Sequence, residues 1–258
     1  MGGGVSGMPG WGNGARMSSH WSPPELLARS DGDRIPGALS GSLLYTRPEH
    51  AAVRDSIVQF VARHPPDASA HELEPPTHAP VALEIGFDHG MRILDHARRF
   101  PDWRWLGLEI RKARVRAAAP HAPPNCLLVR GDARSVVASV LPTGCLDLVY
   151  ILFPTPTENP RHLLVTPGFV SDLGRVLAPG GRVHLATDVE GYWDWAKQCF
   201  EGWDENDAPL PYGPVLSRRE RVCKRDALPV YRATWQRPDS WDGGGSCPLR
   251  NASPGTSA

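Results

Sequence analysis

The chain has very little lysine and no excess of charge of either sign. Its 258 residues contain 28 Lys and Arg against 28 Asp and Glu, and the three lysines are Lys112, Lys197 and Lys224. A formal net charge of zero excludes binding to nucleic acid through the charge of the whole chain, so any such contact depends on local basic patches. Arginine, which supplies the other cations, suits phosphate and planar stacking better than lysine does.

The chain also lacks the cysteine spacings of a metal site. No C-x-x-C pair is present, and no cysteine has a histidine at ligand spacing. This pattern argues against a zinc site and against a disulfide framework, so we expect no bound metal. The five cysteines are Cys126, Cys145, Cys199, Cys223 and Cys247.

Long apolar runs are absent as well. No segment approaches the roughly 18 apolar residues of a membrane span, and the N-terminus has no apolar signal-peptide core. We therefore expect a cytoplasmic protein without a membrane partner, as a monomer or a weak homodimer. Residues 1–40 and 238–258 are rich in Gly, Pro and Ser and are predicted to be disordered tails, which leaves one domain over residues 41–237.

The most informative segment is VALEIGFDHG, residues 81–90. Alternating apolar residues predict a buried strand, and two glycines, Gly86 and Gly90, follow it. From residue 91 the apolar positions Ile93, Leu94 and Ala97 have helical spacing. A strand, a glycine turn and a helix N-terminus are typical of the start of a nucleotide-type cofactor site.

Strand and helix patterns alternate along the rest of the domain. This alternation predicts an α/β fold with a doubly wound, mostly parallel sheet and helices on both faces. Gly180 and Gly181 are expected to stop a helix before the fifth strand. The predicted strands are 81–86, 103–109, 126–130, 146–153, 182–187 and 230–235, and the predicted helices are 49–63, 91–100, 111–118, 134–140, 168–177 and 191–202.

Acidic residues fall at or near the ends of four predicted strands. They are Glu84, Glu109, Asp132 and Asp188, and in such a sheet ligands bind at the carboxyl ends of the strands. Glu109 is placed to accept the two ribose hydroxyls of a nucleoside, and Asp132 with Ala133 is placed to bind the amine of an adenine. Each acid taken alone fits equally well as a cap of the helix that follows it.

The glycine turn separates two classes of cofactor. A dinucleotide site uses G-x-G-x-x-G to hold a pyrophosphate, whereas this chain has Asp88 between Gly86 and Gly90. A carboxylate there repels a pyrophosphate and favours a cationic ligand. S-adenosylmethionine carries a sulfonium and an ammonium group, so it suits these acidic surroundings better.

At this point the chain resembles the bacterial tRNA (guanine-N7)-methyltransferase family, which is built on the class I S-adenosylmethionine-dependent fold. The resemblance covers roughly residues 43–237. Three general motifs carry it, LEIGFDHG (83–90), WLGLEIRKARV (105–115) and GDA (131–133), together with three more specific ones. The specific motifs are LDLVYILFPTPTENPRH (146–162), HLATDVEGY (184–192) and SRRERVCKRDALPVYRATW (217–235).

The resemblance implies residue roles. Glu84, Glu109 and Asp132 are expected to contact the cofactor, while Asp188 and residues 217–220 are expected to contact the target guanosine in the variable loop of tRNA. The full set of candidate cofactor-binding residues is Glu84, Gly86, Gly90, Glu109, Ile110, Asp132 and Ala133, and the candidate substrate-binding residues are Asn159, Asp188, Ser217 and Glu220.

The chain departs from the family at the motif after the fourth strand. Where the family has FPDPW followed by a lysine and a basic run, this chain has Thr155 for the aspartate, Thr157 for the tryptophan and Asn159 for the lysine, with the apolar residues 163–165 after them. Thr155, at the catalytic position, and Asp188 are therefore the candidate catalytic residues. The loss of these three family residues bears on the identity of the methyl acceptor more than on methyl transfer itself.

Three interpretations follow. The first is N7 methylation of a tRNA guanosine. The second is a related N-methyltransferase that acts on a small nitrogen heterocycle, and the third is a non-catalytic module that binds S-adenosylmethionine or RNA. For RNA contact the sequence offers a basic segment at 218–225 and the arginine-rich region 92–116, although both patterns also fit solvated helix faces.

Overall fold

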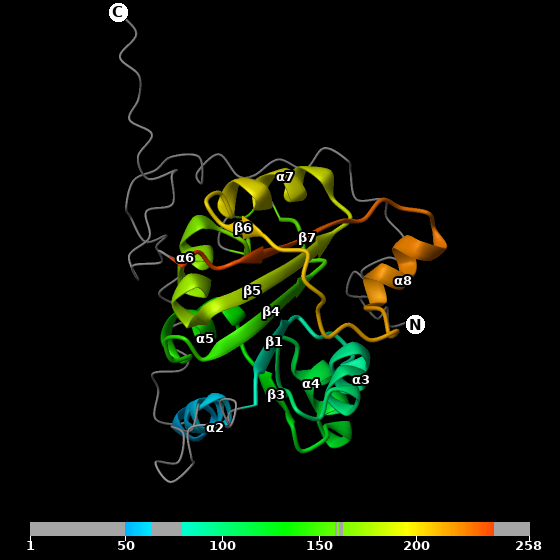
Figure 1. The fold of residues 1–258 in the computed structure, drawn as a ribbon. Coiled ribbons are helices and arrows are strands. Elements are labelled where there is room, and N and C mark those ends of the chain that lie inside the picture. Colours follow the sequence, from blue (N-terminus) through cyan, green and yellow to red (C-terminus); the bar gives the residue numbers. More distant parts are fainter. Residues whose placement is uncertain (1–49, 63–78, 158, 160–161, 240–258) are drawn as a thin grey trace, which may run out of the picture.

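A seven-stranded sheet with helices on both faces forms the body of the molecule (Figure 1). The computed structural model describes residues 50–62, 79–157, 159 and 162–239. The sheet has the order β3-β2-β1-β4-β5-β7-β6, with β1 to β5 parallel and β7 antiparallel to both β5 and β6. The strands are β1 (Val81–Ile85), β2 (Arg104–Glu109), β3 (Cys126–Arg130), β4 (Leu146–Leu152), β5 (Leu177–Thr187), β6 (Asp204–Glu205) and β7 (Tyr231–Gln236). The predicted doubly wound, mostly parallel sheet is confirmed.

Most of the helices also lie where their apolar periodicity placed them. The predicted helices over 91–202 all form, each within three residues of the expected bounds, and 49–63 contains α2. The helix nearest the C-terminus, α8, was not predicted, nor was the short strand β6. The helices are α2 (Ala51–Val61), α3 (Met91–Arg99), α4 (Lys112–Ala118), α5 (Ala133–Ser139), α6 (Pro167–Val176), α7 (Glu190–Cys199) and α8 (Arg218–Arg225), with one 3₁₀ turn, η3 (Ala119–His121).

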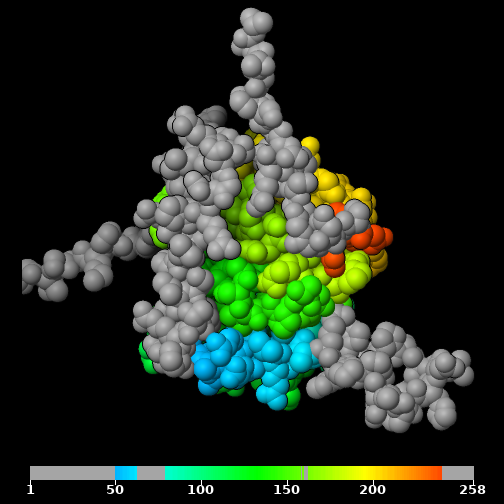
Figure 2. Space-filling view, turned by 90° about the vertical axis from the view of Figure 1, so that its left-hand side faces the viewer, coloured from blue at the N-terminus to red at the C-terminus, as the bar shows by residue number. Residues whose placement is uncertain are grey.

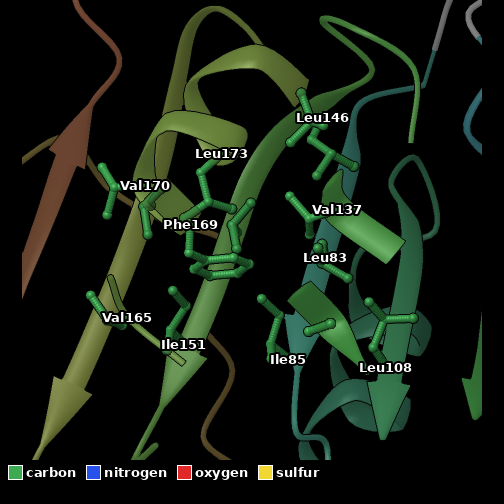
Figure 3. Packing of buried hydrophobic residues seen from close by; sticks show 14 of the residues in the cluster. Leu83, Ile85, Leu108, Val137, Leu146, Ile151, Val165, Phe169, Val170 and Leu173 are labelled. Atoms are coloured by element: carbon green, nitrogen blue, oxygen red, sulfur yellow. The ribbon is translucent and has the colours of Figure 1, made fainter. Parts of the chain in front are cut away.

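The two faces of the sheet carry two separate hydrophobic clusters, because successive strand residues point to opposite sides. On one face Leu83 and Ile151 of β1 and β4 pack with Val137 of α5 and Phe169 of α6 (Figure 3). On the other face Trp105, Leu148 and Tyr150 pack with Ile93 and Ala97 of α3. All of these side chains are at most 4% exposed, so both faces are fully covered.

Helix α2 joins the first of these clusters. Its Ile57 and Val61 are completely buried, and its residues form the blue surface in Figure 2. Arg104 of β2 donates from Nη1 to the carbonyl oxygens of Phe60 (2.7 Å) and Ala62 (2.9 Å). These bonds satisfy carbonyls at the end of α2 that have no partner inside the helix, and they fix α2 against the sheet.

Gly180 and Gly181 have a different role from the predicted one. Helix α6 ends at Val176, and β5 begins at Leu177, so the two glycines lie inside the strand instead of before it. The pairing of β4 with β5 shifts register between Leu146 and Leu148, and Gly180 has a φ of +73°. The glycines therefore form a bulge in β5, where a positive φ is accepted without strain.

The described residues cover only part of the chain to which three sequence-based expectations apply. None of the helices within 50–62, 79–157 and 162–239 has the length and apolar character needed to cross a bilayer. Within the same ranges no group of His, Cys, Asp and Glu is placed to hold a metal ion, and four cysteines are free and buried. The predicted tails and Cys247 lie outside the described residues, apart from residues 238 and 239.

This topology places the carboxyl ends of β1 to β5 along one edge of the sheet. The strand order reverses between β1 and β4, which is the point where ligands bind in open α/β sheets. In Figure 1, α8 (orange) lies beyond the carboxyl ends of β4 and β5, apart from the helices that cover the two faces. The candidate site is therefore built from this edge and α8.

Candidate active site

The turn after β1 has three residues in the left-handed region. Gly86 has a φ of +74°, Asp88 of +53° and Gly90 of +76°. A Cβ at Gly90 would lie 2.8 Å from the Cβ of Ala118, whereas a Cβ at Gly86 would meet nothing within 4 Å. Gly90 is therefore required by packing as well as by conformation. At Gly86 the requirement is conformational, and the turn leaves open space beside its backbone.

Glu109, the last residue of β2, joins this turn to the next one. Its side chain is 3% exposed. Oε2 accepts from the backbone N–H of Asp88 (3.1 Å), and Oε1 accepts from the backbone N–H of Arg111 (2.9 Å) and from its Nε (3.1 Å). A carboxylate held by two backbone N–H groups is fixed in place at the sheet edge. Ile110, next to it, is 63% exposed and forms an apolar rim.

Asp88 is paired with cations of the protein itself. Arg111 donates from Nη2 to its Oδ1 at 3.2 Å, and Arg114 approaches the same oxygen with Nη1. The sequence predicted that an acid at this position favours a cationic ligand. The structure supplies two guanidinium groups as its partners.

Asp132 forms the N-cap of α5. Its Oδ1 accepts from the backbone N–H of Arg134 at 3.0 Å, and the Arg134 side chain binds Oδ2 at 2.6 Å. The sequence analysis allowed that each acid caps the helix that follows it, and Asp132 has this capping role in the structure. Ala133, the first residue of α5, is 7% exposed and lies at the same edge.

Glu84 lies within the sheet, on the face covered by α3. The register places it beside Tyr150 of β4, Tyr150 beside His184 of β5, and His184 beside Thr234 of β7. Arg92 of α3 lies above this row and donates from Nη1 to Glu84 Oε2 at 2.9 Å. Burial raises the pKa of Glu84, and the charge of Arg92 opposes that rise.

Arg92 also binds aromatic faces. Its guanidinium carbon lies 4.0 Å from the ring centroid of Tyr150 and 4.9 Å from that of Tyr212. The side chain is 2% exposed, and its Nε and Nη2 have no hydrogen-bond partner among the described residues. Cation–π contacts of this kind strengthen when they are desolvated, so Arg92 holds the segment around Tyr212 against α3.

His96 makes a second link between α3 and that segment. Its Nδ1 lies 2.8 Å from the carbonyl oxygen of Arg92, and Gly213 donates its backbone N–H to Nε2 at 3.0 Å. Both contacts are satisfied only by the neutral Nδ1–H tautomer. Burial, together with the charge of Arg92, lowers the pKa of His96 to about 4. His96 is therefore a fully buried residue of α3.

The segments predicted to contact the acceptor come together at the carboxyl end of β5. Ser217 is the N-cap of α8 and accepts from the backbone N–H of Glu220. Arg219 of α8 donates from Nε and Nη2 to Oδ2 of Asp188, and this contact raises the pKa of Arg219. Glu220 is 6% exposed and binds Tyr212 (3.3 Å) and Arg232 (3.4 Å). Asp188, Ser217 and Glu220 thus form one structural unit.

The segment after β4 carries the other two candidates. Thr155 is exposed, and the backbone N–H of Asn159 binds Thr157 Oγ1 at 3.1 Å. Among the described residues, no hydrogen bond links Thr155 to Asp188. Beyond residue 162 the chain turns inward, since Leu163 and Val165 are completely buried.

Several arginines of the region 92–116 are engaged within the protein, whereas Arg98, Lys112 and Arg116 are exposed. Arg92 is buried against Glu84, Arg104 binds the end of α2, and Arg111 and Arg114 pair with acids of the glycine turn. The sequence suggested a basic region because residue spacing does not show which of these arginines have partners within the protein. The eight-residue separation of Glu84 and Arg92 is not a helical or strand pairing interval, so it gave no local signal.

Comparison with known proteins gives consistent relatives. A family model described as a putative methyltransferase matches residues 78–211. A "tRNA (guanine-N(7)-)-methyltransferase" of Caulobacter vibrioides is 33% identical over 202 residues, which cover 72% of this chain and 88% of that protein. A protein of the same name from Aeromonas hydrophila is 36% identical over 174 residues, 62% of this chain and 73% of its own length. A solved structure of the 16S rRNA methyltransferase KamB, 19% identical, covers 62% of this chain and 88% of its own with a TM-score of 0.48.

Proposed function

This chain belongs to the tRNA (guanine-N(7)-)-methyltransferase family, and we propose that it transfers the methyl group of S-adenosylmethionine to N7 of a guanosine in the variable loop of tRNA. The site residues of this reaction are those at the sheet edge and on α8. The cytoplasm, where tRNA is available, is the proposed location.

The residues at the edge of β1, β2 and β3 fit S-adenosylmethionine. Glu109 presents a fixed carboxylate for the ribose hydroxyls, and Ile110 is an exposed apolar side chain beside it for the adenine. The open space at Gly86 admits a ligand close to the backbone. Asp132, at the start of α5, is the acceptor for the adenine amine. When bound, the sulfonium supplies the electrophilic methyl group.

One observation carries the choice of guanosine. Asp188 and the start of α8 are adjacent, and Asp188 already accepts two N–H donors from the planar guanidinium of Arg219. The N1 and N2 edge of guanine presents two N–H donors in a similar plane. The guanine edge would replace the Arg219 side chain, which is 34% exposed and whose ion pair is therefore screened by solvent.

The chemistry explains why Thr155 is compatible with this activity. Guanine N7 carries an in-plane lone pair, so it attacks a methyl group without first losing a proton, and no general base is needed. The protein has to align the base with the methyl group and exclude water. A carboxylate at the N1 and N2 edge also offsets the positive charge that develops on the ring. Asp188 supplies that carboxylate, and Thr155 leaves transfer slower by about 10²-fold relative to an acid.

Methyl-labelled S-adenosylmethionine and tRNA that lacks N7-methylguanosine provide the test. We expect label at one guanosine of the variable loop, located by strand cleavage specific for N7-methylated guanosine. The same sample should bind S-adenosylmethionine by calorimetry. Cofactor binding without any label in tRNA would overturn the proposal, and label in a small nitrogen heterocycle instead would establish the second interpretation.

A further inference from the structure

Helix α8 has one face that carries only cations. At about 100° per residue, Arg218, Arg221, Lys224 and Arg225 fall within one third of the helix circumference. All four are exposed. The opposite side holds the two buried residues of the helix, Glu220 and Cys223. We refer to these four exposed residues as the basic face of α8.

Two cations of the basic face remain available for a ligand. Within the described parts of the chain, neither Arg218 nor Lys224 forms an ion pair or a side-chain hydrogen bond. Arg225 is paired with Asp226, and Arg221 donates to the carbonyl oxygen of Leu216 and contacts the Met91 sulfur. An unpaired cation can turn toward an anion without breaking an existing ion pair or hydrogen bond, whereas a paired cation has to break one first.

The contacts of α8 place the basic face next to the reaction site. Arg219 reaches Asp188 at the end of β5, and Arg221 reaches Met91, the first residue of α3 after the glycine turn. Helix α8 thus lies between the acceptor acid and the cofactor turn.

In the other segments that border the site, most arginines are paired with acids or the chain is buried. Leu163 and Val165 are buried in the core, with the Val165 carbonyl bound to Trp195. Arg111 and Arg114 of the region 92–116 are engaged with Asp88. Since the chain has no net charge, phosphate binding at this edge depends on a local group of free cations.

We infer that the basic face of α8 binds the phosphate backbone that flanks the target guanosine, with Arg218 and Lys224 as its principal contacts. The inference rests on the proposed function for the identity of the RNA. Its physical basis is charge complementarity at a fixed distance from Asp188, since a helix anchored at Arg219 and Arg221 presents its outer side in one orientation.

The salt dependence of binding tests this inference. The full chain and its Arg218→Gln/Lys224→Gln variant are titrated with a labelled, unmodified tRNA transcript over a series of KCl concentrations, without cofactor. Each phosphate contact contributes about 0.7–0.9 to the slope of log Kd against log salt, so the variant should lose about 1.4–1.8. The matched control is Arg54→Gln/Lys197→Gln, which removes two cations with 40% and 47% exposed side chains from α2 and α7, outside both candidate RNA segments, and should leave the slope near that of the wild type.

Each outcome decides one question. An α8 variant with the wild-type slope, or a control variant that loses as much, would overturn the inference, as would a wild-type chain that does not bind the transcript. Binding that depends on α8 without methylation at N7 would preserve the docking surface and remove the proposed activity. Methylation of tRNA by an α8 variant whose tRNA binding is unchanged would preserve the proposed activity and remove the docking surface. Unchanged calorimetric affinity for S-adenosylmethionine shows that the variants are folded.

Discussion

All five acids assigned to the site are bound to arginines in the structure, and three of these pairs lie at the carboxyl edge of the sheet. Glu109 pairs with Arg111, Asp132 with Arg134 and Asp188 with Arg219. These arginine side chains are 34–57% exposed, so solvent screens them and weakens each pair. A ligand that brings N–H or O–H donors can therefore displace the guanidinium at small cost.

Glu109→Gln should weaken S-adenosylmethionine binding by about 1–3 kcal/mol, because an amide replaces one acceptor oxygen of the carboxylate. The measurement is isothermal titration with the cofactor. Asp194→Asn, which removes an acid from an exposed pair with Lys197 on α7, is the control and should leave the affinity unchanged. Equal affinities for wild type and Glu109→Gln would exclude Glu109 from the cofactor site.

Asp188→Asn should lower kcat/KM for tRNA by about 10²-fold, because an amide presents one acceptor where the guanine edge needs a carboxylate. Cofactor affinity should stay the same, since Asp188 lies at the acceptor side. Asp226→Asn, at an exposed acid just after α8, controls for the loss of a negative charge nearby. If both variants lose activity equally, Asp188 has no specific role toward the base.

At the scale of the elements, the polar row across the sheet connects the two halves of the site. Glu84, Tyr150 and His184 lie side by side on three strands, and Arg92 covers them from α3. Arg92 and His96 then hold the segment that leads into α8, through Tyr212 and Gly213. The cofactor turn and the acceptor helix are thus fixed to the same helix, α3.

Arg92→Met should destabilise the protein by about 3–5 kcal/mol, because it leaves Glu84 buried without its partner. Urea unfolding at neutral pH measures the loss. Arg99→Met removes the exposed pair with Asp95 on the same helix and should cost no more than about 1 kcal/mol. Equal losses for the two variants would show that the buried pair contributes no more than a surface pair.

Acid should loosen the contact between α3 and Gly213. The pKa of His96 is lowered from 6.5 to about 4, so below pH 6.5 the unfolded chain binds more protons than the folded one. The stability from His96 is complete above pH 6.5 and is lost as the pH falls toward 4, by about 1–2 kcal/mol between pH 7 and 5. His184, whose pKa is also lowered to about 4 by burial, acts in the same direction.

The unfolding free energy at pH 7 and 5 measures this effect for wild type and His96→Gln. The variant should show the smaller drop, because one of the two titrating histidines is gone. The protection factor of the Gly213 amide, which corrects hydrogen exchange for the intrinsic effect of pH, should also be smaller in the wild type at pH 5 than at pH 7. An identical drop in both proteins would contradict the assigned role of His96.

The strands and most helices could be predicted from the sequence because their apolar periods are strong. Helix α8 could not, since its sequence RRERVCKR has no apolar stripe and its buried positions are Glu220 and Cys223. Its stability comes from tertiary contacts, the Ser217 cap and the Asp188 pair. The bulge at Gly180 was missed for a similar reason, because only the register between β4 and β5 distinguishes it from a helix stop.

The candidate site was predicted to a comparable extent. The acids at the strand ends follow from the topology, so Glu109, Asp132 and Asp188 all lie at the expected edge. Their arginine partners could not be assigned, because pairing across turns depends on side-chain geometry that spacing does not contain. Whether each acid binds cofactor or acceptor remains a prediction.

At the scale of the whole molecule, the acids at the sheet edge are paired with arginines, whereas two cations of α8 have no ion pair among the described residues. The strand order places acids along one edge of the sheet, and α8 presents free cations on the outer side of that edge. If the proposed function and the inferred RNA contact hold, a neutral chain binds RNA through this local group of cations.

The most direct test of the proposed N7 methylation uses two tRNA transcripts that differ at one atom. One carries guanosine at the target position of the variable loop, and the other carries 7-deazaguanosine, in which carbon replaces N7 and the N1 and N2 edge is unchanged. Transfer of label from methyl-labelled S-adenosylmethionine is measured for both. We predict that only the guanosine transcript is labelled; equal label in the two transcripts, or none in either, would contradict N7 methylation of tRNA.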